Sequence, residues 1–291
     1  MPITYYLSPD FVNFTFFPPP AVAPNLLNAL NKGLVQGIDL SGRNTAAPTA
    51  AMGDIWGYPL IAAGQQVRVL PTAAFTLAMI SDSVNDAGAG TGAQTVQVNY
   101  LDSNYLPHVA VYTLNGQNAV TNATSVDGIA TGVPITNVLR INGMEVITAG
   151  TGLANAGNIY ACDSTNTYAS GVPVTTTKVY DFMLAGENID DTSAFTIPAG
   201  YYGFAVQLTP AIADVTATIK YGRVRMGLTT GSNGIFRNID FGGITSSTNP
   251  ETIDPAIFPL LLPMTDIRMQ CQVSAATEVC CLNMILIWPT T

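Results

Sequence analysis

The sequence has few charged residues. Asp, Glu, Lys and Arg together make up 10% of the 291 residues, against about 25% in an average soluble domain, whereas 48% of the residues are hydrophobic. The polar surface must therefore come largely from Thr, Asn, Ser and Gly. Because an isolated soluble protein usually carries more charge than this, we expect further subunits to cover much of the surface, and we predict a homo-oligomer. An unusually neutral monomer is the alternative.

Basic residues are scarcer than acidic ones. Ten Lys and Arg stand against nineteen Asp and Glu, which gives a net charge of −9. A nucleic-acid-binding surface needs a basic patch to neutralise phosphates. The densest local group, Lys220 with Arg223 and Arg225, fits the paired surface face of a strand better than a phosphate site. We therefore predict no nucleic-acid partner.

Long apolar runs are also missing. The longest, residues 256–264 and 282–288, fall far short of the ~20 residues that span a bilayer, and prolines interrupt or end them. The first residues show neither a basic segment nor a continuous apolar one of the kind that signal peptides have. We expect no membrane partner and predict synthesis and retention in a cytoplasm.

The four cysteines do not suit a metal site or a disulfide framework. Zinc sites use paired ligands such as Cys-x-x-Cys with a second pair, whereas Cys280 and Cys281 are adjacent and would face opposite sides of a strand. Cys271 could lie across a hairpin from either of them, and Cys162 stands alone. Buried free thiols are the prediction for all four.

The residues for catalysis are equally sparse. His108 is the single histidine, no Gly-x-Ser-x-Gly motif accompanies it, and we interpret it as a turn-capping or surface residue. The glycine-rich segment 88–92 is followed by a strand, with no lysine near it, so a hairpin loop is favoured over a phosphate-binding loop.

Two acidic clusters remain, Asp82 with Asp86, and Glu187 with Asp190 and Asp191. Neither cluster has the ligand spacing of a calcium loop. We interpret them as solvated loop carboxylates, with a bound divalent cation as the minor alternative. The sequence thus predicts no enzyme, no catalytic residues, no cofactor and no metal site.

Period-two alternation is the main structural signal. Val96, Val98 and Tyr100 alternate with polar residues, and Val109, Val111 and Thr113 repeat the period after a short connection, which predicts a hairpin with one buried face. Similar segments recur between glycine-rich turns without an intervening helical pattern. Such spacing is typical of an antiparallel β-sandwich or barrel.

The chain divides into three predicted segments. Residues 1–59 form an extended arm with a short helix at 24–33, residues 60–158 form a first β-sandwich region, and residues 159–291 form a second one. The absence of a charged linker near residue 158 leaves open whether the two β regions are separate domains or one interlocked body.

Aromatic residues and prolines crowd the start of the arm. An apolar segment of this density needs a surface to cover it, either on a neighbouring subunit or on its own sandwich. An edge strand folded onto its own core is the alternative. The predicted interaction residues are Tyr5, Tyr6, Phe11, Phe14, Phe16, Phe17, Pro18, Pro19 and Pro20.

Short motifs, many of them glycine-rich, are spread over roughly the C-terminal three quarters of the chain. They are residues 90–93 (GTGA), 101–105 (LDSNY), 113–116 (TLNG), 139–143 (LRING), 149–152 (AGTG), 155–159 (NAGNI), 196–200 (TIPAG) and 262–268 (LPMTDIR). In this order they resemble a pattern of virion structural proteins of tailed bacteriophages. The resemblance implies a β-rich, jelly-roll-like particle component with no chemistry of its own.

Composition, arm and resemblance together give the functional prediction. We expect an all-β structural component of a bacteriophage virion, assembled in the host cytoplasm. Its expected role is that of a capsid decoration or cement protein that binds other virion proteins such as the major capsid protein. The alternative is a tail, baseplate or head-fibre protein that binds the host surface.

Overall fold

The structure is a computed structural model that describes residues 33–56, 68–213, 219–230, 237–245, 260–275 and 277–290. Within these residues the chain is built from antiparallel strands, with one short 3-10 helix, η1 (Thr176–Lys178). The predicted all-β antiparallel fold is confirmed. The aromatic and proline residues of the predicted arm, and positions 24–32 of its predicted helix, lie outside the described residues.

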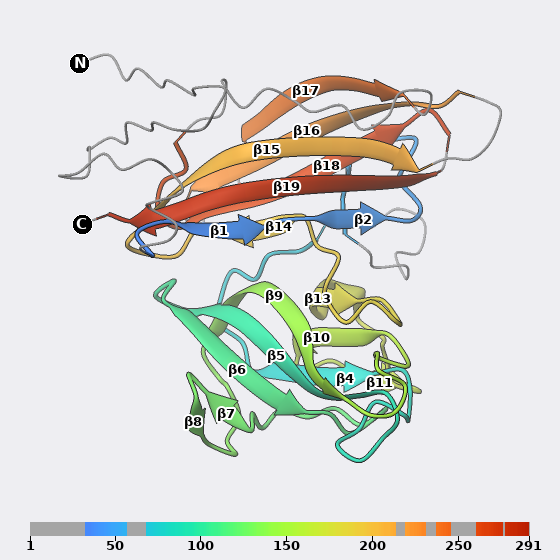
Figure 1. Cartoon of the computed structure of the whole chain (residues 1–291), viewed down its shortest axis with the longest axis vertical. Helices are drawn as coiled ribbons and strands as arrows, with labels where there is room; N and C mark the ends of the chain where they lie inside the picture. The colour runs from blue at the N-terminus through green and yellow to red at the C-terminus, as the bar shows by residue number, and fades with distance from the viewer. Residues whose placement is uncertain are drawn as a thin grey trace.

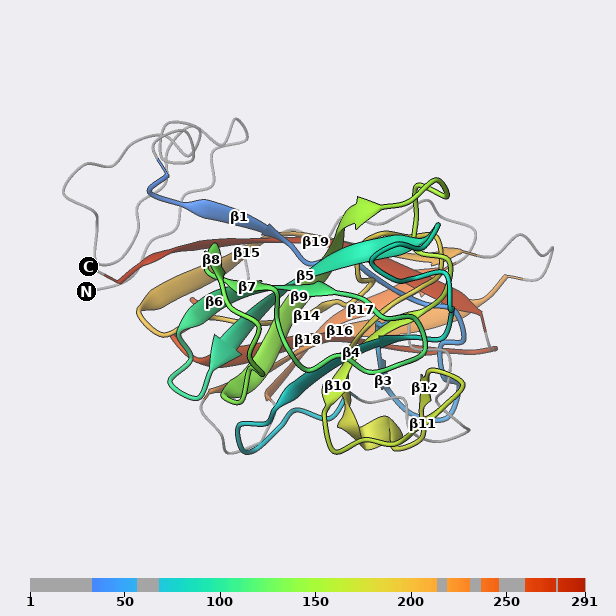
Figure 2. The same ribbon diagram turned by 90° about the horizontal axis from the view of Figure 1, so that it is seen from below.

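Two packed β bodies make up the molecule (Figure 1). We call the described residues within 33–56 and 193–290 the jelly-roll body, and residues 68–189 the inserted body. Figure 2 views the molecule from the side of the inserted body, whose strands β5 and β6 lie in front of the jelly-roll strands.

Two facing sheets form the jelly-roll body. The first is four-stranded: β1 (Gln36–Asp39), β19 (Glu278–Pro289) and β15 (Tyr201–Ala213) in that order, with β2 (Gly42–Asn44) also on β19. The second is five-stranded: β14 (Ala194–Thr196), β18 (Thr265–Val273), β16 (Tyr221–Thr230) and β17 (Arg237–Thr245), with β3 (Gly53–Asp54) also on β18. All pairings are antiparallel.

The order of these strands along the chain is that of a jelly roll. The chain passes from β1 and β2 in the first sheet to β3 and β14 in the second, back to β15, then to β16 and β17. It returns beside β15 at Leu261, whose amide and carbonyl both bond Gly203 at 2.8–2.9 Å, and finishes with β18 and β19. This alternation between two facing sheets is the jelly-roll arrangement.

Buried and exposed side chains alternate along β19, which places one face of the strand against the other sheet. Val279, Cys281 and Ile285 are buried in the core between the two sheets, whereas Leu282 and Met284 point outward and are 57% and 43% exposed. Successive side chains of a strand face opposite sides, so one set fills the core and the other forms the outer surface.

The inserted body is a second antiparallel sandwich. Its larger sheet has the order β8 (Ile129–Ala130), β7 (Ser125–Val126), β6 (Pro107–Thr113), β5 (Ala93–Asp102) and β9 (Val138–Ala149). The facing sheet has β13 (Val179–Met183), β10 (Ile159–Asp163) and β4 (Leu77–Ser81), and β11 (Tyr168–Ala169) pairs with β12 (Val172–Pro173) beside it.

The predicted hairpin at β5 and β6 is present, with one correction. Val96, Val98 and Tyr100 are buried as predicted, but the register pairs Val98 with Ala110 and Val96 with Tyr112. Ala110 and Tyr112 therefore face the core, and Val109 is 37% exposed. Directly paired residues share a face, so the turn at 103–106 decides which of the two alternating sets of side chains on the second strand is buried.

The chain passes between the two bodies twice, and the two ends on the jelly-roll side lie next to each other. Trp56 forms a bridge with Thr192, and the Ser193 amide donates to the Ile55 carbonyl at 3.0 Å. The chain thus leaves the jelly-roll body and re-enters it at adjacent positions, an arrangement that suits the insertion of a domain.

The observed order of the bodies differs from the three consecutive segments predicted above. Residues 36–56, assigned to the arm, supply β1, β2 and β3 of the jelly roll. The predicted boundary at 158 falls inside the inserted body, because β10 pairs with β4 and β13 pairs with β10. The pairing of β10 with β4 joins segments about 80 residues apart, as Ile159 with Ser81, and strand composition does not specify such a partner.

Candidate functional site

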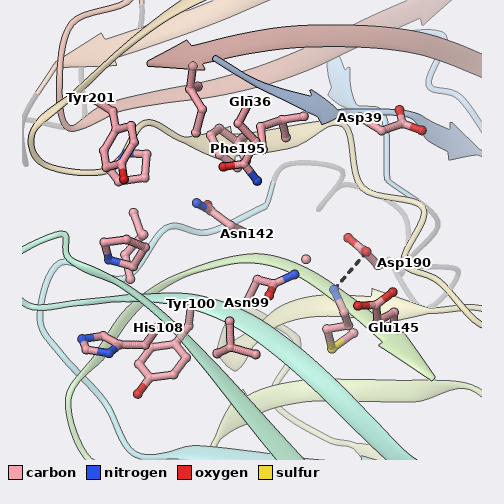
Figure 3. A pocket seen from close by; sticks show the side chains of 18 of the residues that line it. Gln36, Asp39, Asn99, Tyr100, His108, Asn142, Glu145, Asp190, Phe195 and Tyr201 are labelled. Atoms are coloured by element: carbon pink, nitrogen blue, oxygen red, sulfur yellow. Dashed lines mark hydrogen bonds between the residues drawn. The ribbon is translucent and has the colours of Figure 1, made fainter. Parts of the chain in front are cut away.

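A cleft lined by both polar and apolar residues lies between the two bodies (Figure 3). Its volume is about 420 Å³. The inserted body contributes β5, β6 and residues 142–145 of β9, and the jelly-roll body contributes β1, the start of β15 and residues 195 and 198. Clefts at domain interfaces are frequent binding sites, and this one brings together residues from distant parts of the chain.

His108 lies at this cleft with a carboxylate partner. Its Nδ1 is 2.8 Å from Oδ2 of Asp127, whose Oδ1 accepts the Val109 amide at 2.9 Å. The ring stacks on Tyr100 with centroids 5.3 Å apart, and Nε2 is 3.8 Å from Oδ2 of Asp102. The predicted surface or turn-capping histidine is in fact 29% exposed and bound to an acid on the β7–β8 turn.

This environment shifts the pKa of several neighbours of His108. Burial opposes ionisation of Asp127, but the bonds from His108 and the Val109 amide lower its pKa overall. Burial raises the pKa of Tyr100 to about 12. No Ser, Thr or Cys lies among the described residues lining the cleft, so the histidine–aspartate pair has no aliphatic hydroxyl or thiol there to activate.

Two carboxyl groups, the buried Asp181 and the partly buried Asp190, lie where the inserted body joins the jelly roll. Oδ1 of Asp181 accepts the Thr192 hydroxyl at 2.7 Å, and Oδ1 of Asp190 accepts the Met144 amide at 3.0 Å. Burial raises the pKa of Asp181, and burial together with the charge of Asp181 raises that of Asp190 well above its usual value, although Arg68 opposes both shifts.

These shifts account for an otherwise unpartnered atom. Oδ2 of Asp181 is buried and has no donor, which is costly for an ionised oxygen. We expect Asp190 to carry a proton and to supply that donor, because two interacting carboxyl groups disfavour ionising together. Asp190 is therefore not the solvated loop carboxylate that the sequence predicted.

An ion pair inside the protein crosses the junction between the bodies. Arg140 of β9 donates Nε to Oδ1 and Nη2 to Oδ2 of Asp266 on β18, at 2.7 and 3.0 Å, and the two side chains are 5% and 3% exposed. The Thr196 hydroxyl donates to the same Oδ1 at 2.6 Å. This bidentate geometry fixes both distance and orientation.

Further bonds hold β9 and the connecting segments in place. Asn142 Nδ2 donates to the Thr196 carbonyl and its Oδ1 accepts the Thr196 amide, both at 2.9 Å. Arg68 donates its amide to Asp54 at 2.6 Å and its Nη2 to the Ile141 carbonyl at 2.9 Å. The walls of the cleft are thus fixed by polar contacts that link both bodies.

The acidic clusters singled out in the sequence have structural roles. Asp86 is fully buried: Oδ1 accepts the amides of Ala93 and Ala156 at 2.7 and 2.8 Å, and Oδ2 accepts the Ser81 hydroxyl and the Gly157 amide at 2.7 and 2.9 Å. It joins the glycine-rich segment 88–92 to the loop before β10, so that segment is a packed turn.

The remaining acids also have partners. Asp82 Oδ1 accepts the amide of Asn158 at 2.8 Å, which corrects the prediction of a solvated side chain. Glu187 and Asp191 lie 2.8 and 3.2 Å from Nη2 of Arg43 on β2. Among the described residues no group of three or more His, Cys, Asp or Glu could hold a metal ion.

The cysteines match the prediction of free thiols. Cys162, Cys271 and Cys281 are buried, and Cys280 is partly buried. Burial raises the pKa of Cys280 to about 11 and those of Cys162 and Cys281 to about 12. Such thiols are poor nucleophiles at neutral pH.

Sequence reasoning did not find the junction residues Arg68, Arg140, Asn142, Asp181 and Asp266. A signal for one of them exists, since Arg140 interrupts the apolar run Val138–Leu139–Arg140–Ile141, and a charge within such a run is rarely buried unless it is paired. The partner on β18 lies 126 residues further along and nothing in the sequence indicates it.

Fold and site together define the class of the molecule: an all-β protein whose jelly roll carries an inserted antiparallel sandwich, with a cleft at the junction. No helix in the described part of the chain is long and apolar enough to cross a membrane. No protein-family model matches the chain, and the search of curated proteins found no match.

Among solved structures, the chain shows weak similarity to infectious bursal disease virus. A structure of the Gt strain is 11% identical, with 87% of this chain and 69% of that chain covered, at a TM-score of 0.23. The VP2 subviral particle of the same virus is 11% identical, with 87% and 70% covered, at a TM-score of 0.16. TM-scores this low do not establish a shared fold.

Proposed function

We propose that the protein is a structural component of a virus particle, and specifically a decoration or cement protein on the capsid of a tailed bacteriophage. The observation that carries this proposal is the jelly-roll strand order. Jelly rolls recur in viral capsid and lectin domains, and fold alone does not determine function. The analogy gains weight from the motif resemblance and from the surface of this chain.

The outer face of the first jelly-roll sheet supports an assembly role. β19 lies between β1 and β15, and its outward residues Leu282 and Met284 remain 57% and 43% exposed. Large apolar side chains at the centre of a sheet face are typical of surfaces covered by another protein. Only 10% of the chain is charged, which fits a subunit that shares its surface with neighbours.

In this role the protein acts by binding alone. Homo-oligomers bury equivalent surfaces around a symmetry axis, and a cement subunit also bridges neighbouring shell proteins. We propose that the aromatic and proline residues between Tyr5 and Pro20 form the arm that contacts the major capsid protein or another copy. A host-binding tail or head-fibre protein is the second candidate, favoured by the cleft between the bodies.

The mass of the purified full-length protein in solution, measured by light scattering, tests the proposal first. A closed homo-oligomer that co-sediments with empty shells of its particle is the expected result. The double substitution L282D/M284D should dissociate the oligomer, whereas L153D, at a 79% exposed loop residue of the inserted body, serves as the matched control. A monomer that ignores shells contradicts the proposal.

A truncation tests the arm separately. Removing residues 1–32 leaves β1 intact, since that strand begins at Gln36. The truncated chain should retain its β-sheet circular dichroism but no longer bind shells. A truncated protein that coats shells normally would refute the proposed role of the arm.

A further inference from the structure

We infer that the cleft between the two bodies is a binding site for a neutral saccharide. The inference does not depend on a virion role, because it concerns the purified chain and its own cleft. A volume of about 420 Å³ corresponds to roughly 14 water molecules at about 30 Å³ each. That is room for one or two sugar rings.

The charge of the lining determines the class of ligand. Carboxylates from both bodies line the cleft, and no Lys or Arg lies among its described lining residues. A phosphate, sulfate or acidic sugar would be repelled by these side chains and would find no Lys or Arg there to pair with, while His108 is already paired with Asp127. The cleft therefore disfavours anionic ligands.

The same carboxylates do not call for a cationic ligand. Asp39 accepts the Ser41 amide at 3.0 Å, Asp127 is bonded to His108, and Glu145 accepts the Gln97 side-chain amide at 2.8 Å. Asp190 accepts the Met144 amide at 3.0 Å and is expected to share a proton with Asp181. Each acid has a partner that reduces its need for a cation, yet each carboxyl group can accept further hydrogen bonds. Neutral hydroxyl groups are suited to such acceptors.

A donor and an aromatic ring complete the lining. Asn99 lies two residues along β5 from Gln97, which pairs with Glu145 of β9, and its Nδ2 has no acceptor among the described residues. Tyr201 lies on the opposite wall (Figure 3), and it is partly buried. An aromatic side chain offers an apolar face with a polar tip, which suits a sugar ring with its C–H face and its hydroxyl groups.

The cleft is also held in a fixed shape. The Arg140–Asp266 ion pair and the reciprocal Asn142–Thr196 bonds connect its two walls. Binding to a pre-formed site avoids the cost of ordering its walls. A small polar ligand, with little apolar area to bury, gains most from such rigidity.

A glycan array probed with the purified full-length protein tests this inference. The array carries neutral mono- and oligosaccharides of glucose, galactose, mannose and N-acetylglucosamine, together with sialylated and sulfated glycans. Titration calorimetry then measures the affinity of the strongest neutral saccharide. The expected result is millimolar to micromolar binding of a neutral saccharide, with no binding of acidic glycans.

Substitutions then locate the site. N99L, which keeps the size of the side chain and removes its amide, should weaken binding about tenfold or more, the equivalent of one lost hydrogen bond, and Y201L should do the same. N118L, at an exposed turn residue away from the cleft, should bind as the wild type does. Matching thermal unfolding curves confirm that the variants are folded.

Three outcomes would overturn the inference. They are the binding of no saccharide at millimolar concentration, a preference for sialylated or sulfated glycans, and equal affinity of wild type and N99L. None of these results depends on whether the protein joins a particle, so they are distinguishable from failure of the proposed virion role.

Discussion

Replacement of Arg140 by Met is expected to reduce the free energy of unfolding by about 3–5 kcal/mol, the cost of removing one partner of a buried ion pair. Both side chains are almost fully buried, at 5% and 3% exposed, so solvent does not screen the loss. Asp266 would keep the Thr196 hydroxyl at 2.6 Å but lose both guanidinium bonds. Met retains the apolar stem of Arg, so the substitution tests charge more than packing.

The double-mutant cycle separates the pair from its surroundings. D266N alone should also destabilise, and R140M/D266N should cost less than the sum of the single variants by roughly 1–3 kcal/mol, because neither residue then leaves a buried charge behind. Arg43→Met is the matched control. Arg43 also contacts two acids, but it and Glu187 are 29% and 41% exposed, so its loss should cost at most about 1 kcal/mol.

Urea denaturation followed by circular dichroism measures all four variants. Because Arg140 links the inserted body to the jelly roll, R140M should also broaden or split the transition as the two bodies unfold separately. The reasoning is refuted if R140M costs no more than R43M, or if the single effects simply add in the double variant.

Three further predictions concern groups inside the inserted body and the cysteines. The pKa values of Asp181 and Asp190 are raised on folding. The free energy of unfolding should therefore fall as the pH rises from the unfolded pKa of about 3.9 through the raised native values. In D190N, whose amide can donate to Asp181, the urea midpoint should decline less steeply with pH, and an unchanged slope would contradict the shared proton. D86A should cost more than about 3 kcal/mol in urea denaturation, because it leaves buried amides without an acceptor; a cost below about 1 kcal/mol would show that water replaces the carboxylate. In native protein at neutral pH only Cys280 should react with a thiol reagent, and slowly, since burial raises its pKa to about 11; rapid labelling of a second cysteine would contradict the buried placement of the other three.

The strand pattern was readable from the residues because it depends on local chemistry. Val96, Val98 and Tyr100 alternate with polar neighbours, and a half-buried strand demands that pattern. Even so, the predicted buried face of the second strand was wrong, because the turn at 103–106 sets the register and a shift by one residue exchanges the two faces.

The environment of the acidic residues could not be predicted from local sequence. Asp86 and Asp190 lie in loop-like sequence, and acids in loops are usually solvated. In the structure Asp86 accepts four hydrogen bonds: one from Ser81 at the end of β4, one from Ala93 at the start of β5, and two from the loop before β10. Those donors come together only when the two sheets of the inserted body pack.

By itself the amino-acid sequence determined the all-β class and the antiparallel strands, which follow from the period of two along the chain. It also determined the free thiols and the scarcity of residues suited to catalysis or metal binding, which follow from composition and spacing. Only the tertiary structure decided that residues 36–56 and the C-terminal strands form one jelly roll, that the two connections to the inserted body meet at the Trp56–Thr192 bridge, and that a cleft opens between the bodies. These depend on pairings such as Arg140 with Asp266, which lie far apart in the chain and are selected by the packing of whole sheets.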